Sequence, residues 1–304
     1  MIERKEKFIS IILLVPSIIA VAIFIYGFIF WTIRVSMSKW KGIIPNYDFT
    51  GLKNYIDIFK NTRFRIDIVN NVCFTALFII VCTIVGLFLA ILLDKVIRGE
   101  SFFRTIFIFP LAISFVVSGI IWRWIFVPTA GINALLNNIF IGIGLENLNV
   151  HWGWYITTQK VVFFNLALIP IIIAASWQFV GYVMAMYLAG IRGISYELRE
   201  AARIDGANEF QVYTKVIFPM LKPITFSALI ILGHISLKIF DLVYIMTGRG
   251  PAFVTDFPSI FMYETVFRSN NYAQGATIAI VMLLMVLVVI VPYLIISLRG
   301  EIEI

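Results

Sequence analysis

The sequence predicts an all-α polytopic membrane protein with six transmembrane helices. Hydrophobic residues occupy 61% of its 304 positions, against 24 Lys and Arg and 17 Asp and Glu. Soluble globular domains do not show this balance. Six apolar runs reach the ~20 residues that one helix needs to cross a bilayer core. They cover residues 9–33, 69–93, 105–126, 161–190, 223–246 and 276–298. We therefore expect a single membrane domain over residues 1–304.

The first two runs raise questions of processing and redox chemistry. The run at 9–33 follows the basic start MIERKEK, but it is longer than a signal-peptide core and lacks a small-residue cleavage site. We expect it to remain as a membrane span. Cys73 and Cys82 both lie in the second run, nine residues apart. That spacing fits neither a metal site nor a disulfide framework, so both are predicted to be small membrane hydrophobes.

The loops between the runs contain two short helical segments. In loop 34–68, turn signals precede a predicted amphipathic helix from Leu52 to Phe59, and loop 127–160 carries a second helical stretch, GINALLNNIF. Both are expected on the outer face of the membrane. Six spans place the two termini on one side, but the loops of the two sides carry twelve and eleven basic residues. The positive-inside rule therefore does not choose the side.

A polar island, SYELREAARIDGANEFQVYTKVIFPMLKP at residues 195–223, separates the fourth and fifth runs. Ser195 is a suitable N-cap for a first helix, and Gly206 is suited to end that helix in the left-handed conformation. Asn208 with Gln211 three positions later forms a capping-box pattern. The island is predicted to fold as helix, glycine turn and helix.

The residues of the first island helix would suit contact with a partner. The small side chains of Ala201 and Ala202 would let a partner groove approach the backbone, while Arg199, Arg203 and Asp205 could fix the register by charge. From these features alone, a docking element and an ordinary hairpin between spans are equally supported.

The sequence carries no recognisable catalytic apparatus. It contains no G-x-x-x-x-G-K-[ST] loop, no G-x-S-x-G and no H-E-x-x-H, and its two histidines, His151 and His234, are far apart. We therefore expect the chain to have no catalytic residue, to bind no metal and not to be an enzyme. The basic residues are dispersed over loops, so they predict contact with membrane lipid and no nucleic acid.

The segment EAARIDGANEFQVYTKVIFP resembles the EAA motif of permease subunits in ATP-binding-cassette importers. Four residues match that motif as they stand: Glu200, Ala201, Ala202 and Gly206. Val216 and Phe218 depart from it conservatively. The fuller pattern, with PMLKP after it, is similar to the carbohydrate-importer branch that includes maltose-type permeases. GLKNY, GINALL and TGRGP agree with that branch as well, except that Arg249 replaces a glycine.

This resemblance implies a topology and a function. In such importers the loop, here residues 191–222, is cytoplasmic and docks into an ATPase subunit, so both termini are expected to be cytoplasmic in a prokaryotic inner membrane. Six residues are expected to couple the chain to the ATPase: Glu200, Ala201, Ala202, Arg203, Asp205 and Gly206. The chain would form half of a sugar pathway that works by alternating access.

The resemblance also implies partners. They are a second homologous but non-identical permease, two cytoplasmic ATPase subunits that hold ATP and Mg, and an extracytoplasmic solute-binding protein. This chain itself is expected to bind no cofactor. The sugar is not identified, and monosaccharides, oligosaccharides and glycerol phosphate derivatives remain open. A proton-coupled secondary sugar transporter or channel is the alternative from another class, although inverted repeats and an acid relay, which it would predict, are not visible in the sequence.

Polar residues within spans are candidates for the substrate pathway because they are costly there. In the fourth span these are Asn165, Trp177 and Gln178, which would suit a sugar but could equally serve helix packing. Small residues such as Gly181 in the same span and Gly86 in the second span would suit close helix contacts, within this chain or with a partner.

The fifth span carries His234, Lys238 and Asp241 at i, i+4 and i+7, on one face of a continuous helix. This face is predicted either to line the pathway or to hold an internal ion pair that merely orients the helix.

Overall fold

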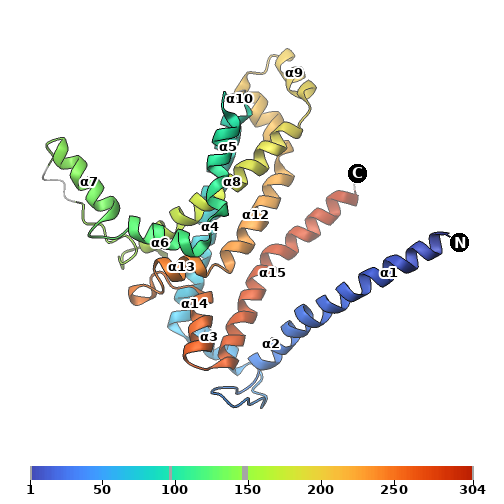
Figure 1. The fold of residues 1–304 in the computed structure, drawn as a ribbon, viewed down its shortest axis with the longest axis vertical. Coiled ribbons are helices and arrows are strands. Elements are labelled where there is room, and N and C mark those ends of the chain that lie inside the picture. Colours follow the sequence, from blue (N-terminus) through green and yellow to red (C-terminus); the bar gives the residue numbers. More distant parts are fainter. Residues whose placement is uncertain (1, 96–97, 146–149, 303–304) are drawn as a thin grey trace. The chain divides into compact units, whose positions relative to one another are not determined.

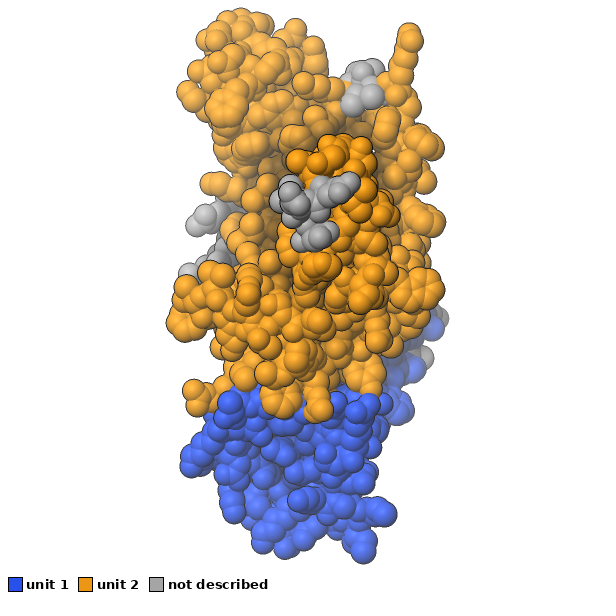
Figure 2. Space-filling view, turned by 90° about the vertical axis from the view of Figure 1, so that its left-hand side faces the viewer, with its two compact units in different colours: residues 1–64, 261–284 blue, residues 65–260, 285–304 orange. Residues whose placement is uncertain are grey.

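The computed structural model describes residues 2–95, 98–145 and 150–302 of the chain. The chain divides into two compact units, coloured separately in Figure 2. Unit 1 comprises Met1–Phe64 and Phe261–Leu284, and unit 2 comprises Arg65–Ile260 and Met285–Ile304.

Helices make up most of the described chain (Figure 1). The α-helices are α1 (Ile2–Val21), α2 (Phe28–Ser36), α3 (Lys53–Lys60), α4 (Thr62–Asp94), α5 (Glu100–Ile108), α6 (Phe115–Ile125), α7 (Gly131–Gly142), α8 (Ile169–Gly193), α9 (Tyr196–Ile204), α10 (Glu209–Gln211), α11 (Phe218–Met220), α12 (Lys222–Leu237), α13 (Asp241–Met246), α14 (Pro258–Tyr263) and α15 (Tyr272–Ile302). Three π-helical turns lie among them, at Ala22–Gly27, Val212–Ile217 and Glu264–Arg268. Three 3-10 turns are described at Phe109–Ala112, Leu166–Leu168 and Pro251–Phe253.

The predicted helical membrane architecture is confirmed, with a range for the number of spans. Four helical segments of the described chain are long and apolar enough to cross a membrane: Leu13–Ser36, Thr62–Asp94, Leu166–Gly193 and Tyr272–Pro292. Two bent pairs raise the number to six if each pair is one span: Glu100–Ala112 with Phe115–Ile125, and Glu209–Met220 with Lys222–Leu237. The chain is therefore a multi-pass membrane protein with four to six spans, and the count of six stays a prediction.

The third predicted span, 105–126, is not one straight helix. The chain bends by 100° between α5 with its 3-10 turn and α6. Pro110 lies inside that turn and cannot donate a helical hydrogen bond. Ser114 then starts a new helix, because its hydroxyl accepts a hydrogen bond from the Val117 amide at 3.3 Å. A proline followed by a capping serine is the local cause of the bend.

The fourth predicted span, 161–190, begins too early. Residues 160–165 form an antiparallel pair, β1 (Lys160–Val161) with β2 (Phe164–Asn165), and Val162 in its turn has a φ of +57°. The expectation of a purely α-helical chain is wrong at this hairpin. Apolar character alone does not distinguish a short strand from the start of a helix, which explains the error.

The fifth predicted span, 223–246, is interrupted. Helix α12 ends at Leu237 and α13 begins at Asp241. Ser259 stabilises the break, because its hydroxyl donates a hydrogen bond to the carbonyl of Ile239, which the interrupted helix leaves free.

Unit 1 confirms the short amphipathic helix predicted in the first loop, as α3. The same loop packs on the start of α15: the rings of Trp40 and Tyr272 lie 4.8 Å apart, and the Ala273 amide donates to the Trp40 carbonyl at 2.9 Å. The hydroxyl of Thr277 donates to the carbonyl of Ser36 at 3.2 Å. These contacts join the end of α2 to α15.

Helix α8 is the central helix of unit 2 and runs from the hairpin to α9 (Figure 1). The apolar part of this span is 67% buried, against 28% for the span that contains α4. Glycine allows its close packing, since a Cβ at Gly181 would lie 1.8 Å from the carbonyl oxygen of Phe107 in α5. A Cβ at Gly86 in α4 would lie 2.8 Å from the side chain of Val183. These small residues therefore serve packing within the chain, as one of the two alternatives predicted.

Candidate functional site

The polar island folds as predicted, into a helix, a glycine turn and a second helical segment. The Ser195 hydroxyl accepts a hydrogen bond from the Glu197 amide at 3.2 Å and caps α9. Gly206 has a φ of +85°. Asn208 and Gln211 form both hydrogen bonds of a capping box, each at 2.9 Å. The second segment is less regular than expected, because a π-helical turn joins α10 to α11.

The six predicted coupling residues lie on α9 and in the turn after it. Five are exposed: Glu200, Ala201, Arg203, Asp205 and Gly206. Ala202 is half-buried and packs against the core of the chain. One face of α9 is thus attached to the membrane helices, and the other is open.

The three most exposed of the large apolar side chains on the island were not predicted from the sequence. Tyr196 is 67% exposed, Ile204 80% and Phe210 77%. They lie on α9 and α10, within an otherwise charged segment. The sequence does contain a signal for them, because large apolar residues within a charged, exposed segment are typical of interaction surfaces. We call these three residues the apolar tip.

The island is anchored to α4 by an ion pair that is largely shielded from solvent. The Arg199 guanidinium Nη1 lies 2.9 Å from Asp94 Oδ2, and the two side chains are 15% and 9% exposed. The Tyr213 hydroxyl donates to the same carboxylate oxygen at 3.0 Å, and Arg199 also donates to the carbonyl of Ile191. We call Asp94, Arg199 and Tyr213 the anchor cluster. It joins α4, α9 and the π-helical turn of the island.

A second, exposed ion pair closes the island on itself. Arg203 Nε lies 2.8 Å from Glu209 Oε1, across the Gly206 turn. The hydrogen bond and charge of Glu209 raise the pKa of Arg203 above its ordinary value. Because both side chains are solvated, this pair is worth little in stability and chiefly limits the turn geometry.

Helix α8 presents one open face. Ile169, Ile173 and Trp177 recur every four residues and are 38%, 40% and 37% exposed, while most of the residues between them are buried. The Trp177 ring lies edge-on to Trp122 of α6, with centroids 5.7 Å apart. Trp122 is a candidate pathway residue that the sequence analysis missed, because nothing in sequence brings α6 beside α8.

Two of the predicted pathway residues make hydrogen bonds inside the protein. Gln178 is 2% exposed and its Nε2 donates to the carbonyl of Ile113, at the bend before α6, at 2.6 Å. Asn165 lies in β2 rather than in the fourth span, and its Nδ2 donates to Asn70 Oδ1 at 2.5 Å. Both side chains brace the fold.

The predicted common face of His234, Lys238 and Asp241 is wrong for Asp241, since α12 ends at Leu237 and Asp241 begins the next helix, α13. His234 Nε2 and Lys238 Nζ lie 2.7 Å apart, whereas Asp241 is exposed at the start of α13. Among the described residues, a contact between the amine of Lys238 and the imidazole of His234 stands in place of the internal ion pair predicted as one alternative for this face.

Among the described residues, no group of three or more His, Cys, Asp or Glu side chains could hold a metal ion. Cys82 is buried and Cys73 half-buried, both as free thiols within α4.

Comparison with known proteins places this geometry in a family. Residues 82–298 match the family described as binding-protein-dependent transport system inner membrane component. A probable ABC transporter permease protein of Pyrococcus horikoshii is 43% identical over 291 residues, which is 96% of each chain. The xylose/arabinose import permease protein of Haloferax volcanii is 34% identical, over 91% of this chain and 84% of its own.

A solved structure shares the fold. One chain of a bacterial alginate ABC transporter, crystallised with an alginate pentasaccharide-bound periplasmic protein, superposes with a TM-score of 0.76 over 94% of both chains. The sequences are 21% identical.

Proposed function

Because the chain belongs to the family of binding-protein-dependent transport system inner membrane components, we propose that it is the permease subunit of an ATP-driven sugar importer. The observation that carries this proposal is the polar island, which presents an apolar tip and is anchored to the membrane helices. Such an island can bind a partner protein and transmit the movement of that partner to the membrane helices. ATP and Mg belong to the ATPase subunits, and this chain is not an enzyme.

In the proposed topology the single membrane domain of residues 1–304 crosses a prokaryotic inner membrane six times. Each bent pair then counts as one span. The loop 191–222 lies between the fourth and fifth spans on the cytoplasmic side, together with both termini. The EAA resemblance of Glu200, Ala201, Ala202 and Gly206 supports this orientation.

The island docks in a cleft of the cytoplasmic ATPase subunit. Burying Tyr196, Ile204 and Phe210 there removes exposed apolar surface from water. The exposed Glu200 and Asp205 lie beside the tip and fix the register of the contact by charge.

Displacement of the island passes into the membrane through the anchor cluster. When ATP closes the two ATPase subunits, α9 moves with them, and Arg199 transfers that movement to α4 through Asp94. Because Ala202 packs on the core and α9 follows α8 directly, α8 moves as well. Hydrolysis resets the pathway, which gives alternating access.

A second homologous permease and an extracytoplasmic solute-binding protein complete the importer. The open face of α8, with Trp177 beside Trp122, faces the pathway between the two permeases. An aromatic face suits the apolar face of a sugar ring. The relative from Haloferax volcanii is named for xylose and arabinose import, which supports a sugar substrate without identifying it.

A proton-coupled transporter is the weaker alternative. It would use His234 as a relay group, yet Lys238 occupies one ring nitrogen of that histidine. Proteoliposomes that contain both permeases and the binding protein, with and without the ATPase, decide between the two. We expect sugar uptake only with the ATPase and internal ATP. Uptake driven by a proton gradient without ATP would contradict the proposal.

A further inference from the structure

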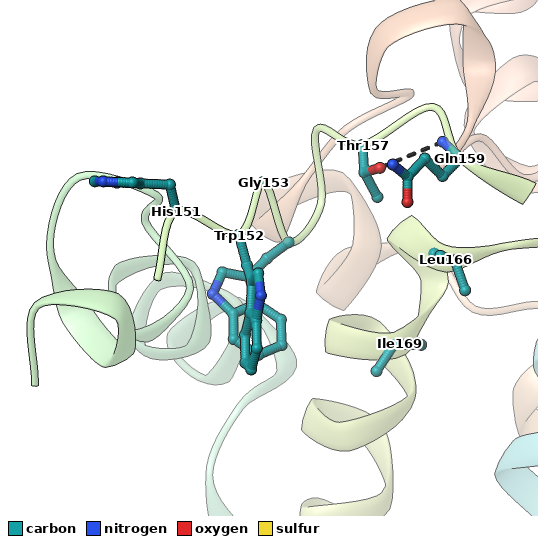
Figure 3. A pocket seen from close by; sticks show the side chains of 8 residues that line it. His151, Trp152, Gly153, Thr157, Gln159, Leu166 and Ile169 are labelled. Atoms are coloured by element: carbon teal, nitrogen blue, oxygen red, sulfur yellow. Dashed lines mark hydrogen bonds between the residues drawn. The ribbon is translucent and has the colours of Figure 1, made fainter. Parts of the chain in front are cut away.

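A cavity of about 360 Å³ lies between residues 151–159 and the start of α8 (Figure 3). Its volume lies in the range of small-molecule binding sites, and it mixes aromatic, aliphatic and polar side chains as such sites do. Six side chains form its walls: Trp152, Trp154, Thr157, Gln159, Leu166 and Ile169. His151 also borders the cavity, but in Figure 3 it points away from the other side chains.

The aromatic wall is held rigid from behind. Asn133, which is 2% exposed, accepts a hydrogen bond from Trp154 Nε1 at 2.8 Å and donates one to the Trp152 carbonyl at 3.0 Å. The two indole rings meet edge-on with centroids 5.0 Å apart. Trp152 is nevertheless 54% exposed. The Trp154 indole is therefore fixed by Asn133, and the exposed Trp152 indole packs edge-on against it with its surface available to a ligand.

A polar rim lies across the cavity from the indoles. Figure 3 places Thr157 and Gln159 together on that side, where the Gln159 backbone amide donates to the Thr157 hydroxyl at 3.3 Å. The Gln159 side chain is exposed and offers both an amide donor and an acceptor. Leu166 and Ile169, at the start of the α8 span, add two apolar side chains to the lining.

The cavity lies at the end of α8 that is remote from the coupling loop. From Ile169 to Gly193 the helix rises ~36 Å, which exceeds the ~30 Å of a bilayer core. In the proposed topology the cavity therefore opens on the extracytoplasmic side. Ile169 is shared by the cavity and by the open face of α8, on which Trp177 follows ~12 Å further along.

We propose that this cavity is an entrance site that binds one sugar unit before it reaches Trp177. The indole of Trp152 stacks on the apolar face of the sugar ring, and Thr157 and Gln159 hydrogen-bond its hydroxyl groups. The released sugar then follows the open face of α8 to Trp177 and Trp122. The inference rests on the proposed function as a sugar permease and adds a site outside the membrane core.

Fluorine NMR of the membrane complex of both permeases and the ATPase subunits, labelled with 5-fluorotryptophan, tests the site directly. The Trp152→Phe variant assigns the Trp152 resonance, and the Trp124→Phe variant assigns that of Trp124, a 71% exposed residue of α6 outside the cavity. The probes are glucose, maltose, xylose, arabinose and trehalose at millimolar concentration, without the binding protein. We expect a saturable shift of the Trp152 resonance by at least one sugar and no shift of the Trp124 resonance.

Two results would overturn the entrance site. One is a Trp152 resonance that no probe shifts, or that moves only in parallel with Trp124. The other is a Trp152 resonance that responds to the sugar-free binding protein but to no sugar, since the cavity would then be a protein-docking surface.

Uptake separates this inference from the proposed function. In proteoliposomes with ATP, Trp152→Ala is expected to lower uptake at limiting substrate about tenfold, and Trp152→Phe less, because phenylalanine keeps an aromatic face. Trp124→Ala is the matched control and should leave uptake unchanged. If ATP-driven sugar uptake exists but Trp152→Ala leaves it intact, the entrance site fails and the permease assignment stands. If no sugar is taken up with ATP, the permease assignment itself fails.

Discussion

Replacing Asp94 by alanine is expected to detach the island from α4. The carboxylate is the shared acceptor of the anchor cluster, at 2.9 Å from Arg199 Nη1 and 3.0 Å from the Tyr213 hydroxyl. Without it, the Arg199 guanidinium keeps its hydrogen bond to Ile191 but loses its counter-charge in a site where its side chain is only 15% exposed.

The expected magnitude follows from the burial of the pair. Removing one partner of a buried ion pair costs ~3–5 kcal/mol, and the slight exposure of Arg199 favours the lower end of that range. A loss of about 3 kcal/mol in the free energy of local opening corresponds to roughly 150-fold more frequent opening. Amides of α9 should therefore exchange hydrogen roughly 150-fold faster.

Hydrogen exchange followed by mass spectrometry measures this opening on the intact chain. Arg203→Ala is the matched control. It breaks the other ion pair of α9, between Arg203 and Glu209, whose side chains are 40% and 65% exposed. It should accelerate exchange only a few-fold. In the reconstituted importer, Asp94→Ala should lower the rate of sugar uptake by a larger factor than it lowers the rate of ATP hydrolysis. Equal exchange rates in Asp94→Ala and Arg203→Ala would show that the Asp94 carboxylate does not hold the island on α4.

Three further substitutions test the glycine turn of the island, the close packing of α8 and the role of Gln178. Gly206→Val should weaken co-purification with the ATPase about 5- to 30-fold, since a side chain in the left-handed region costs ~1–2 kcal/mol. Gly193→Val, also surrounded by open space, is its control, and wild-type yields for both would exclude the turn as a docking requirement. Gly181→Ala should lower the free energy of unfolding by about 3 kcal/mol in thermal denaturation, because the new methyl group meets backbone. Gly142→Ala is the control, because a methyl group there meets open space and should leave the free energy of unfolding unchanged. Equal unfolding temperatures of the two variants would disprove the close packing at Gly181. Gln178→Ala should cost ~1–3 kcal/mol in the same assay, through the loss of its buried hydrogen bond. Unchanged stability with reduced uptake would instead make Gln178 a substrate contact.

The parts of the island that were predictable depend on local chemistry. A capping serine, a glycine in the left-handed region and the Asn208 to Gln211 capping box act within three or four residues. Their physics is therefore visible in a single sequence. The same holds for the amphipathic helix α3.

The anchor cluster was not predictable, because Asp94 and Arg199 are 105 residues apart and meet only in the folded chain. The break in the fifth predicted span has a similar origin. Hydropathy shows that this segment is apolar, but the interruption at residues 238–240 is stabilised by Ser259 from a later helix. The burial of Gln178 was not predictable for the same reason, since its acceptor, the carbonyl of Ile113, lies in the bend before α6.

The accessibility of a thiol at the apolar tip measures whether the island docks in the ATPase on the cytoplasmic side. An Ile204→Cys variant places the thiol at an 80% exposed position, and the native Cys73 and Cys82 lie within α4, so the unsubstituted chain gives the background. Its labelling by a membrane-impermeant maleimide is measured in vesicles of both orientations, with and without the ATPase. We expect labelling from the cytoplasmic side only, slowed at least about tenfold when the ATPase is bound. Labelling from the outside, or a rate that the ATPase does not change, would contradict this expectation.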